Sequence, residues 1–381
     1  MKSLLLSLLA CLPVNAADLS AHLTPILAVG PEGKGNAEAG AAWQKLTASA
    51  DASALPDILK AMNGAGEISA NWLRGAVSVI AQRADGKIPL DAIKAFAADT
   101  ANKPAGRVLA MDLIRRADKT QWDAMVPAML NDPSSELRRE PVSRLLTEGK
   151  TASTVEPLRK ALAAARDEDQ IKEAADALRE KGEIVDLPKH FGFLMDWQVI
   201  GPFDNRKRAG HETVFPPETS VDLNAQYEGR EMKPGEKNTV KWVPCTSSSQ
   251  FGMVDFNKPI GMLKEVAGYA FTTFNSPAER DAEIRLGCKN AWKVWCNGQL
   301  LFARDEYHRG AQIDQYRMPV KLKKGENRIL VKCCQNEQTE TWTVEWEFQM
   351  RICDATGTAI LAEDRKPTPE AALKLSEKAA K

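Results

Sequence analysis

The sequence predicts two folds in one chain, an all-helical N-terminal half followed by an antiparallel β C-terminal half. Up to about residue 183 the chain is rich in Ala and Leu, and Pro and Gly divide it into pieces of helical length. From Phe191 onward apolar and polar residues alternate, and this part holds all four Tyr, ten of the eleven Phe and six of the nine Trp. Apolar residues recurring at three and four indicate helices, and strict alternation indicates strands. These observations predict a multidomain protein, α then β.

Length and charge narrow the classes of protein to consider. A chain of 381 residues predicts two or three domains, since a domain usually has ~100–200 residues. Lys plus Arg and Asp plus Glu both number 51, so no overall field attracts nucleic acid or an anionic membrane. We therefore expect no nucleic-acid partner.

The N-terminus has the pattern of a secretory leader. One Lys precedes an apolar run from Leu4 to Leu12, and small residues follow up to Ala16. This pattern predicts a signal peptide over 1–16 and an exported protein, periplasmic or extracellular. The run is shorter than the ~20 residues that a transmembrane helix requires, so we expect no transmembrane segment. Lipidation at Cys11 is the alternative for an exported chain.

The helical half is expected to span 17–185. Apolar residues recur at helical spacing, for example Leu73, Val77 and Ile80. Pro104 near the start of one piece and Asp132-Pro133 before another are helix-start signals. We predict helices at 19–29, 38–49, 54–63, 67–83, 89–99, 104–117, 120–130, 134–147, 152–166 and 168–181.

A short sequence motif recurs in three of these helices. An aliphatic or acidic residue followed by Pro and a short apolar run recurs at Pro56, Pro127 and Pro157. The segment 125–146 resembles a HEAT repeat, with an aliphatic-Pro helix, an Asp-Pro turn and an Arg-bearing second helix. In that family Asp and Arg hydrogen-bond along the stack; here Asp132 and Arg138 match, whereas the next repeat has Asp167 and no matching Arg.

Helical pairs of this kind bury their apolar faces by stacking, so the resemblance implies a short HEAT-like α-solenoid. An irregular helical bundle is the alternative. Either way the helical half holds no catalytic constellation, and we expect it to act as a scaffold that engages a protein partner.

The boundary between the halves is expected at a linker over 186–190, because the helical pattern stops at Gly182 and Pro188 prevents its continuation. The second domain is expected over 191–362, with a charged mobile tail over 363–381. Many short antiparallel strands separated by turns predict a two-sheet sandwich. We predict strands at 196–200, 240–243, 267–275, 281–287, 291–296, 299–303, 315–322, 327–335 and 342–352.

The most specific local pattern is a β-hairpin within 281–310. Asn297-Gly298 is a turn pair in which both residues tolerate positive φ. The turn length predicts that Trp295 pairs with Leu300, Val294 with Leu301 and Lys293 with Phe302. Trp292 and Trp295 point to opposite faces. We expect Trp295 to pack with Leu300 and Phe302, and Trp292 to face outward.

Three segments resemble the jelly-roll, galactose-binding-like sandwich modules of exported bacterial proteins: 197–203 (WQVIGPF), 292–298 (WKVWCNG) and 324–332 (KGENRILVK). The resemblance covers about 191–361 and implies the fold, but it specifies no ligand, since such modules bind sugars, bind proteins or pack beside a neighbour. Many relatives carry acidic residues before the hairpin, where this chain has Cys288-Lys289-Asn290-Ala291, so a calcium or sugar site at that position is not carried over.

The predicted ligand site is the polar and aromatic loop that follows the hairpin. Exposed aromatic rings bind sugars by stacking, and loops beside a rigid scaffold carry binding residues. By contrast, Trp342 and Trp346 alternate with polar residues and are expected in the core. The candidate ligand-binding residues are Trp292, Arg304, Asp305, Glu306, Tyr307, His308 and Arg309.

The cysteines leave two alternatives open. Apart from Cys11, the six cysteines fall in the C-terminal half: Cys245, Cys288, Cys296, Cys333, Cys334 and Cys353. In an exported domain they permit disulfides with 15 possible connectivities; the alternative is buried free thiols. Adjacent Cys333 and Cys334 point to opposite faces of a strand, so they are not expected to be core residues together. No CxxC spacing is present, and we expect no zinc, other metal or cofactor.

These features favour an exported, non-catalytic binding or scaffold protein, whose sandwich recognises carbohydrate or protein. A purely structural role, with the sandwich capping the solenoid, is one alternative. A glycan-active hydrolase is another, and its acid and base would come from Asp305, Glu306, Asp314, Glu337 and Glu340. No GxSxG, HExxH or phosphate-binding glycine-rich motif supports an enzyme.

Overall fold

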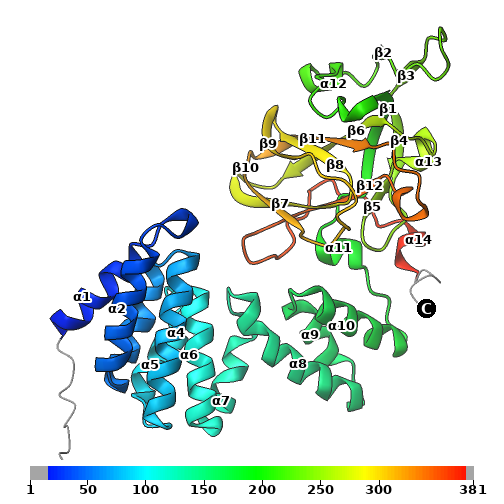
Figure 1. The fold of residues 1–381 in the computed structure, drawn as a ribbon. Coiled ribbons are helices and arrows are strands. Elements are labelled where there is room, and N and C mark those ends of the chain that lie inside the picture. Colours follow the sequence, from blue (N-terminus) through cyan, green and yellow to red (C-terminus); the bar gives the residue numbers. More distant parts are fainter. Residues whose placement is uncertain (1–15, 375–381) are drawn as a thin grey trace, which may run out of the picture. The chain divides into compact units, whose positions relative to one another are not determined.

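The computed structural model describes residues 16–374, and the chain forms two compact units that divide after Gln170 (Figure 1). The expected signal peptide lies outside the described residues except for Ala16. The segment expected as a linker, 186–190, lies inside the second unit and contains helix α11, Leu187–Phe191. Each unit is described by itself.

The first unit consists of helices joined by short turns. The predicted ranges agree with the structure to within a few residues. The largest difference is at 120–130, where α7 ends at Met125 and the 3-10 helix η4, Val126–Asn131, begins with Pro127 in its first turn. The helices are α1 Ala16–Leu27, α2 Asn36–Ser49, α3 Leu55–Ala61, α4 Glu67–Ala84, α5 Leu90–Ala98, α6 Pro104–Ala117, α7 Lys119–Met125, α8 Ser135–Thr151, α9 Glu156–Ala164 and α10 Glu168–Glu180, which continues into the second unit.

One face of each of these helices supplies the core, as the apolar spacing predicts. Leu73, Val77 and Ile80 of α4 are all buried. Side chains cap the helices where the sequence offers them: the Asp118 carboxylate accepts from the Thr120 and Gln121 amides at the start of α7.

The side chain of Asp132 forms a buried ion pair with the earlier helix α6. Its carboxylate is held by Arg107 of α6, with Nη1–Oδ1 at 2.9 Å and Nη2–Oδ2 at 2.5 Å. Arg138 instead donates to the backbone carbonyl of Asp132. Asp167 does have an arginine partner, because Arg139 Nη1 lies 2.8 Å from its carboxylate.

The second unit contains two larger antiparallel sheets and a small one. The six-stranded sheet has the order β4-β1-β6-β11-β8-β9, the four-stranded sheet β10-β7-β12-β5, and the small sheet β2-β3. The strands are β1 Asp196–Asp204, β2 Gln226–Glu228, β3 Thr239–Lys241, β4 Val243–Thr246, β5 Met253–Asp255, β6 Val266–Ser276, β7 Arg280–Cys288, β8 Ala291–Cys296, β9 Gln299–Arg304, β10 Tyr316–Leu322, β11 Gly325–Gln335 and β12 Glu347–Cys353. The short helices are α12 Pro216–Thr219, α13 Asn257–Ile260 and α14 Glu370–Leu373.

The six-stranded sheet is covered on both faces. One face shares a core with the four-stranded sheet and includes Cys333, and the other packs against the segment 205–242 and includes Cys334. Both cysteines are fully buried, which corrects the expectation that only one is a core residue. Their side chains do point to opposite faces, but a segment distant in sequence buries the second face.

A buried lysine attaches this covering segment to the sheet. Lys332 of β11 donates to the carbonyls of His211 and Thr213 and to the Glu218 carboxylate, at 3.0, 2.7 and 2.8 Å. All three ammonium hydrogens therefore have an acceptor, which compensates the burial of the charge.

The hairpin exists as predicted, but its register changes one pair after the turn. Trp295 pairs with Leu300, and a bulge then places Val294 opposite Phe302 and Lys293 opposite Ala303. The expected pairs Val294–Leu301 and Lys293–Phe302 are therefore wrong, because the extra residue of a bulge shifts every later pair.

The predicted strand over 342–352 is shorter than expected. β12 begins only at Glu347, and Thr341–Thr343 form the 3-10 helix η6. Trp346 is fully buried, as expected, but Trp342 keeps 58% of its surface exposed. The placement of Trp342 in the core is therefore wrong.

The end of the chain is held in place as far as it is described. Arg365 Nη1 donates to the Phe193 carbonyl at 2.7 Å, and Thr368 donates to the Asp186 carboxylate at 2.8 Å. Residues 363–374 of the expected mobile tail thus make defined contacts, and 375–381 lie outside the described residues.

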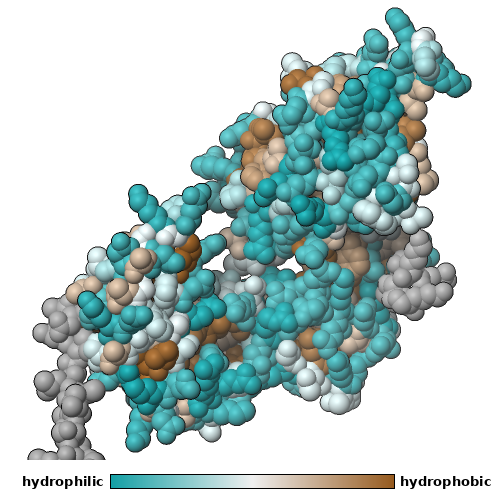
Figure 2. Space-filling view, in the orientation of Figure 1, coloured by the Kyte–Doolittle hydropathy of each residue, from teal (hydrophilic) through white to brown (hydrophobic). Residues whose placement is uncertain are grey.

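The face of the molecule shown in Figure 2 is mainly hydrophilic, with scattered hydrophobic patches. Within residues 16–374 no helix has the length and apolar character needed to cross a membrane. The same residues contain no group of three His, Cys, Asp or Glu side chains placed to hold a metal ion.

Candidate functional site

The structure separates Trp292 from the other predicted ligand residues. Trp292 is fully buried between the two larger sheets, 4.8 Å from the Tyr316 ring, so it has no surface for a ligand. Trp295 is the partly exposed member of the pair. The expectation that Trp292 faces outward and Trp295 inward is therefore reversed.

The loop after β9 lies at the surface, with its charged side chains outward. Arg304, Asp305 and Arg309 are exposed, and Glu306, Tyr307 and His308 are partly buried. Glu306 lies 3.6 Å from Arg309 and 3.9 Å from Arg304. Arg304 is the last residue of β9, so its ion pair joins the start of the loop to that strand, whereas the Glu306–Arg309 pair lies within the loop.

Tyr307 anchors this loop to the β1 side of the unit. Its hydroxyl accepts a hydrogen bond from Asn205 Nδ2 at 3.1 Å, and the Arg208 guanidinium lies over its ring at 5.2 Å. Burial raises the pKa of the Tyr307 hydroxyl, so it remains a neutral group at physiological pH.

His308 attaches the loop to a second segment, 336–343. It has a positive φ of 57°, and its Nε2 forms a hydrogen bond with Asn336 Oδ1 at 2.9 Å. Its ring meets Trp342 edge to face, with centroids 5.4 Å apart. The loop and the exposed indole are therefore neighbours, although 34 positions separate them in the chain.

Hydrogen bonds of the neighbouring residue hold the backbone next to Trp342 in place. The neighbouring Thr343 is buried, and its hydroxyl donates to the carbonyls of Gln338 and Glu340. Lys264 and Gln335 donate to the Thr343 carbonyl at 2.7 and 2.9 Å. The backbone beside the indole is thus fixed, and binding a ligand there requires little ordering of the chain.

An ion pair completes the arrangement. Arg208 contacts the Glu337 carboxylate through two nitrogens, at 2.5 and 3.1 Å, and both side chains remain 47% exposed. Hydrogen bonding from Arg208 lowers the pKa of Glu337. We name this surface the Trp342 edge, consisting of Arg208, Tyr307, His308, Glu337 and Trp342.

The Trp342 edge combines residues that sequence reasoning found with others that it missed. Tyr307 and His308 were predicted, Glu337 was considered only as a catalytic acid, and Trp342 was assigned to the core. A signal for Trp342 exists, because the polar run 336–341 just before it is more typical of a loop than of a strand. Arg208 carries no such signal.

Chemically the edge resembles no proton-transfer site. Arg208 holds Glu337 in its ionised form. The Glu337 carboxylate is a hydrogen-bond acceptor, and the neighbouring Arg208 guanidinium is a donor. The exposed indole offers an apolar face to a ring, and the neighbouring polar groups offer directional hydrogen bonds. Such a combination suits a flat, hydroxyl-rich ligand.

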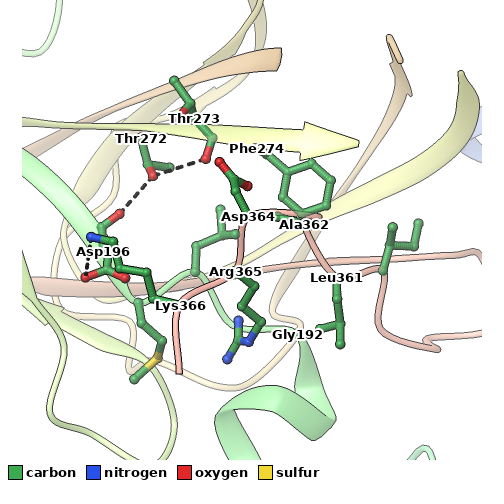
Figure 3. Close-up of a pocket in the computed structure, with 13 residues that line it drawn as sticks. Gly192, Asp196, Thr272, Thr273, Phe274, Leu361, Ala362, Asp364, Arg365 and Lys366 are labelled. Atoms are coloured by element: carbon green, nitrogen blue, oxygen red, sulfur yellow. Dashed lines mark hydrogen bonds and ion pairs between the residues drawn. The ribbon is translucent and has the colours of Figure 1, made fainter. Parts of the chain in front are cut away.

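Two pockets lie elsewhere on the same unit. One has a volume of about 170 Å³ and lies beside β6 and the segment 360–366 (Figure 3). Its Asp196 pairs with Lys366 at 3.8 Å, and its one aromatic residue, Phe274, is buried. The pocket therefore offers no ring for stacking.

The second pocket, of about 370 Å³, lies over the outer face of the six-stranded sheet. It is lined by Trp295, Phe271 and Arg328, whose guanidinium stacks over the Phe271 ring at 5.2 Å and donates to the Val221 carbonyl. The Arg328 guanidinium thus covers the buried Phe271 ring, whereas the Trp342 indole is 58% exposed, so the Trp342 edge is the better candidate.

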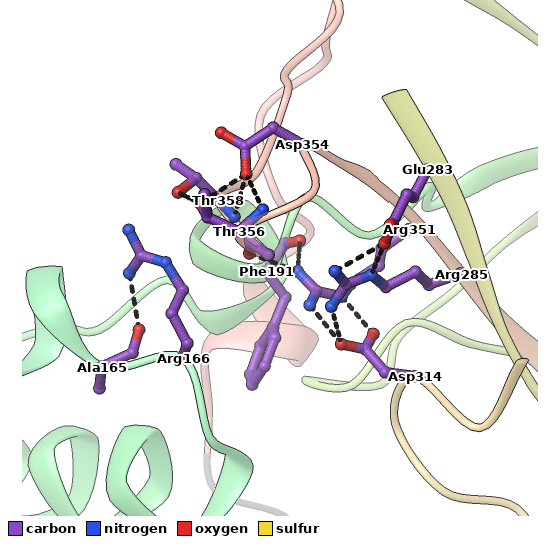
Figure 4. Close-up of polar contacts among 11 residues, drawn as sticks. Ala165, Arg166, Phe191, Glu283, Arg285, Asp314, Arg351, Asp354, Thr356 and Thr358 are labelled. Carbon is purple, nitrogen blue, oxygen red and sulfur yellow. Dashed lines mark hydrogen bonds and ion pairs between the residues drawn. The ribbon is translucent and has the colours of Figure 1, made fainter. Parts of the chain in front are cut away.

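Asp314, a candidate catalytic acid from the sequence, forms ion pairs with arginines of the neighbouring strands. Its carboxylate receives Arg285 Nη1 at 2.6 Å and Arg351 Nε at 2.6 Å, and Arg285 also pairs with Glu283 (Figure 4). Burial alone would raise the pKa of Asp314, but Arg351 and Arg285 outweigh it and lower the pKa. A carboxylate held ionised by two arginines in this way cannot donate a proton to a substrate.

Comparisons with known proteins leave the family open. No protein-family model and no curated relative matches the sequence. A β-glucuronidase from Ruminococcus gnavus, in complex with uronic deoxynojirimycin, aligns over 42% of this chain and 28% of its own, at 13% identity and a TM-score of 0.26.

Two further solved structures are similar over part of the chain. An anti-sigma factor domain-containing protein from Clostridium clariflavum aligns over 43% of this chain and 42% of its own, at 13% identity and a TM-score of 0.21. A β-glucosidase from Kluyveromyces marxianus, in complex with glucose, aligns over 23% and 10%, at 14% identity and a TM-score of 0.18. The chain spans less than half the length of each, and TM-scores this low carry no argument about function.

Proposed function

We propose that this protein is an exported, non-catalytic binding protein whose β unit recognises carbohydrate at the Trp342 edge. The observation that carries the proposal is the exposed indole of Trp342, 58% accessible, beside hydrogen-bonding side chains that other contacts hold in place. A sugar ring presents apolar C–H groups on its face and hydroxyls at its rim, and the edge has complementary groups for both.

Each residue of the edge has a role in this proposal. Trp342 stacks on the face of the sugar ring. Glu337 accepts from a hydroxyl, and Arg208 donates to another. Tyr307 and His308 position the loop and the indole, since their own hydrogen bonds go to Asn205 and Asn336.

The test is a glycan-array screen of the full chain, followed by calorimetric titration of the glycans that bind. We expect Trp342→Ala to weaken binding at least about tenfold, equivalent to ~1.4 kcal/mol, because a central aromatic anchor contributes most of the energy of such a contact. We expect Glu337→Gln to weaken binding less, since the amide retains one acceptor oxygen.

Phe302→Ala is the matched control. Phe302 is also an exposed aromatic residue, at 44%, but it lies on β9 outside the edge. Binding should be unchanged in this variant. If no glycan binds, or if Trp342→Ala and Phe302→Ala behave alike, the carbohydrate proposal is wrong and the purely structural role gains support.

The finer fold assignments belong to the same proposal. We infer that the two larger sheets form a jelly-roll, galactose-binding-like sandwich. The support is their shared core, to which Val331 of β11 contributes from the six-stranded sheet and Phe348 of β12 from the four-stranded sheet. We also infer that the helices stack as a short HEAT-like solenoid that engages a protein partner. The support there is the Arg107–Asp132 pair, which links one helical pair to the next.

A hydrolase is not part of the proposal. Asp314 is paired with Arg285 and Arg351, and Glu337 is paired with Arg208. The remaining candidate acids, Asp305, Glu306 and Glu340, lie at exposed or partly exposed loop positions.

A further inference from the structure

Two buried thiols face each other across the core of the β unit. Cys288 is the last residue of β7 in the four-stranded sheet, and Cys333 lies on β11 in the six-stranded sheet. Their sulfur atoms are 3.8 Å apart. Their relative exposures are 1% and 0%.

The other cysteines of the described residues lack such a partner. Cys334 points to the opposite face of β11 and belongs to the second core. Cys296 lies in the same core as Cys288 and Cys333, but no sulfur contact joins it to either. Among residues 16–374 the Cys288–Cys333 pair is thus the one sulfur–sulfur contact, which selects one pairing from the many that the sequence permits.

We propose that Cys288 and Cys333 form a disulfide bond that joins the two larger sheets when the chain folds in an oxidising compartment. An S–S bond is ~2.0 Å long, so the two sulfur atoms must move about 1.8 Å closer together to form it. Small rotations about the Cα–Cβ bonds can supply part of such a movement. The proposal does not depend on carbohydrate binding.

The reaction is a thiol–disulfide exchange with an external disulfide, such as oxidised glutathione or a thiol oxidase. One cysteine thiolate attacks the donor disulfide, releases one donor thiolate and forms a mixed disulfide; the second cysteine thiolate then displaces the other donor thiolate. The two cysteines lose two protons and two electrons in total, an S–S bond forms between them, and the donor is reduced to two thiols.

The surroundings of the pair determine when this exchange can happen. Burial raises the pKa of the Cys333 thiol well above its ordinary value, and the neighbouring Cys288 adds to this effect. Because the thiolate is the reacting species, the folded and reduced protein should exchange slowly. We therefore expect the bond to form during folding, before the core excludes the oxidant, and to resist reduction afterwards.

The test is to unfold and reduce the full chain and refold it in a buffer of reduced and oxidised glutathione. Free thiols are then alkylated under denaturing conditions, and the peptides are mapped without reduction. We expect one cross-linked peptide pair joining Cys288 to Cys333, with two fewer alkylated cysteines than in the protein refolded with reductant.

A stability measurement on variants provides an independent readout. The urea midpoint of the wild type should rise after oxidative refolding, since a cross-link across 45 residues restricts the unfolded chain. Cys288→Ala and Cys333→Ala should each abolish this rise. Cys296→Ala is the matched control, because Cys296 is buried in the same core at 3% exposure, and it should retain the rise.

Two results would overturn the proposal. One is alkylation of both Cys288 and Cys333 in the oxidatively refolded wild type. The other is a cross-link that joins either cysteine to a different partner. Peptide mapping of the wild type decides the question even if an alanine variant fails to fold.

Discussion

At the scale of single residues, the tryptophans show what alternation can and cannot predict. The alternating pattern correctly places Trp292 and Trp295 on opposite faces of β8, yet the buried member is Trp292. Both faces of this sheet carry a core, so an apolar residue on either face has partners. Which ring stays accessible depends on the segment that covers it and not on the strand itself.

The buried pair of Arg107 and Asp132 gives a prediction at the same scale. Their side chains are only 1% and 4% exposed. Asp132→Ala leaves the guanidinium buried without its charged partner, so we expect the free energy of unfolding to fall by ~3–5 kcal/mol. Urea denaturation followed by circular dichroism measures this loss.

The matched control is an exposed ion pair of the same helix, α6. Arg116 and Asp112 are 69% and 40% exposed, and Asp112→Ala should cost no more than ~1 kcal/mol because solvent screens the pair. Equal losses in the two variants would contradict the assigned role of Asp132.

At the scale of elements, ion pairs between strands and loops hold parts of the chain that local patterns leave undefined. Asp314 has a positive φ of 61° and precedes β10, and Arg285 of β7 and Arg351 of β12 bind its carboxylate. Arg351 also donates to the Phe191 and Gly357 carbonyls at 3.1 Å. One carboxylate therefore connects a loop to two strands of the four-stranded sheet.

This arrangement predicts an acid-sensitive contribution to stability. The folded pKa of Asp314 is lowered from its model-peptide value of 3.8. The ionised group thus stabilises the fold above that value, and the contribution is lost as the pH falls through the lower, folded pKa. Thermal unfolding between pH 7 and pH 2 should show this loss in the wild type.

Asp314→Asn should have a lower melting temperature at pH 7 and a smaller decrease toward acid, because the titrating group is gone. Asp305→Asn, which changes an exposed loop carboxylate, should stay within ~0.5 kcal/mol of the wild type. If Asp314→Asn kept the full acid dependence of the wild type, other carboxylates would have to account for it.

At the scale of the whole molecule, the division into units differs from the boundary that composition suggests. The second unit begins at Ile171, so it includes most of α10. Arg179 of α10 donates to Gln250 at 3.2 Å, and Lys172 lies 4.7 Å above the Phe251 ring. The sequence pattern assigns α10 to the helical half, but the helix packs with the β unit.

Fragments of the chain test this division. A fragment of residues 167–374 should unfold cooperatively and at a higher temperature than a fragment of residues 186–374, because the shorter one lacks α10 and with it the contacts of Arg179 with Gln250 and of Lys172 with Phe251. Differential scanning calorimetry compares the two. Identical melting temperatures would show that α10 contributes nothing to the β unit.

The site was predictable in part. The Asn297-Gly298 hairpin led to the loop after it, and Tyr307 and His308 do lie on the Trp342 edge. The pattern did not identify Trp342, because alternation continues through 342–346 although the strand begins at Glu347. Arg208 was not predictable, since its neighbour Glu337 is 129 positions away.

The sequence by itself determined the type and order of the elements, helices first and antiparallel strands after. The periodicity of apolar residues acts over one or two turns or a few strand residues, so this information is local. Tertiary structure decided that both faces of the six-stranded sheet are buried, where a bulge shifts the register of the hairpin, and which residues meet at the Trp342 edge. These outcomes depend on contacts between distant segments, such as 205–242 on the six-stranded sheet and Asn336 on His308, which no local pattern encodes.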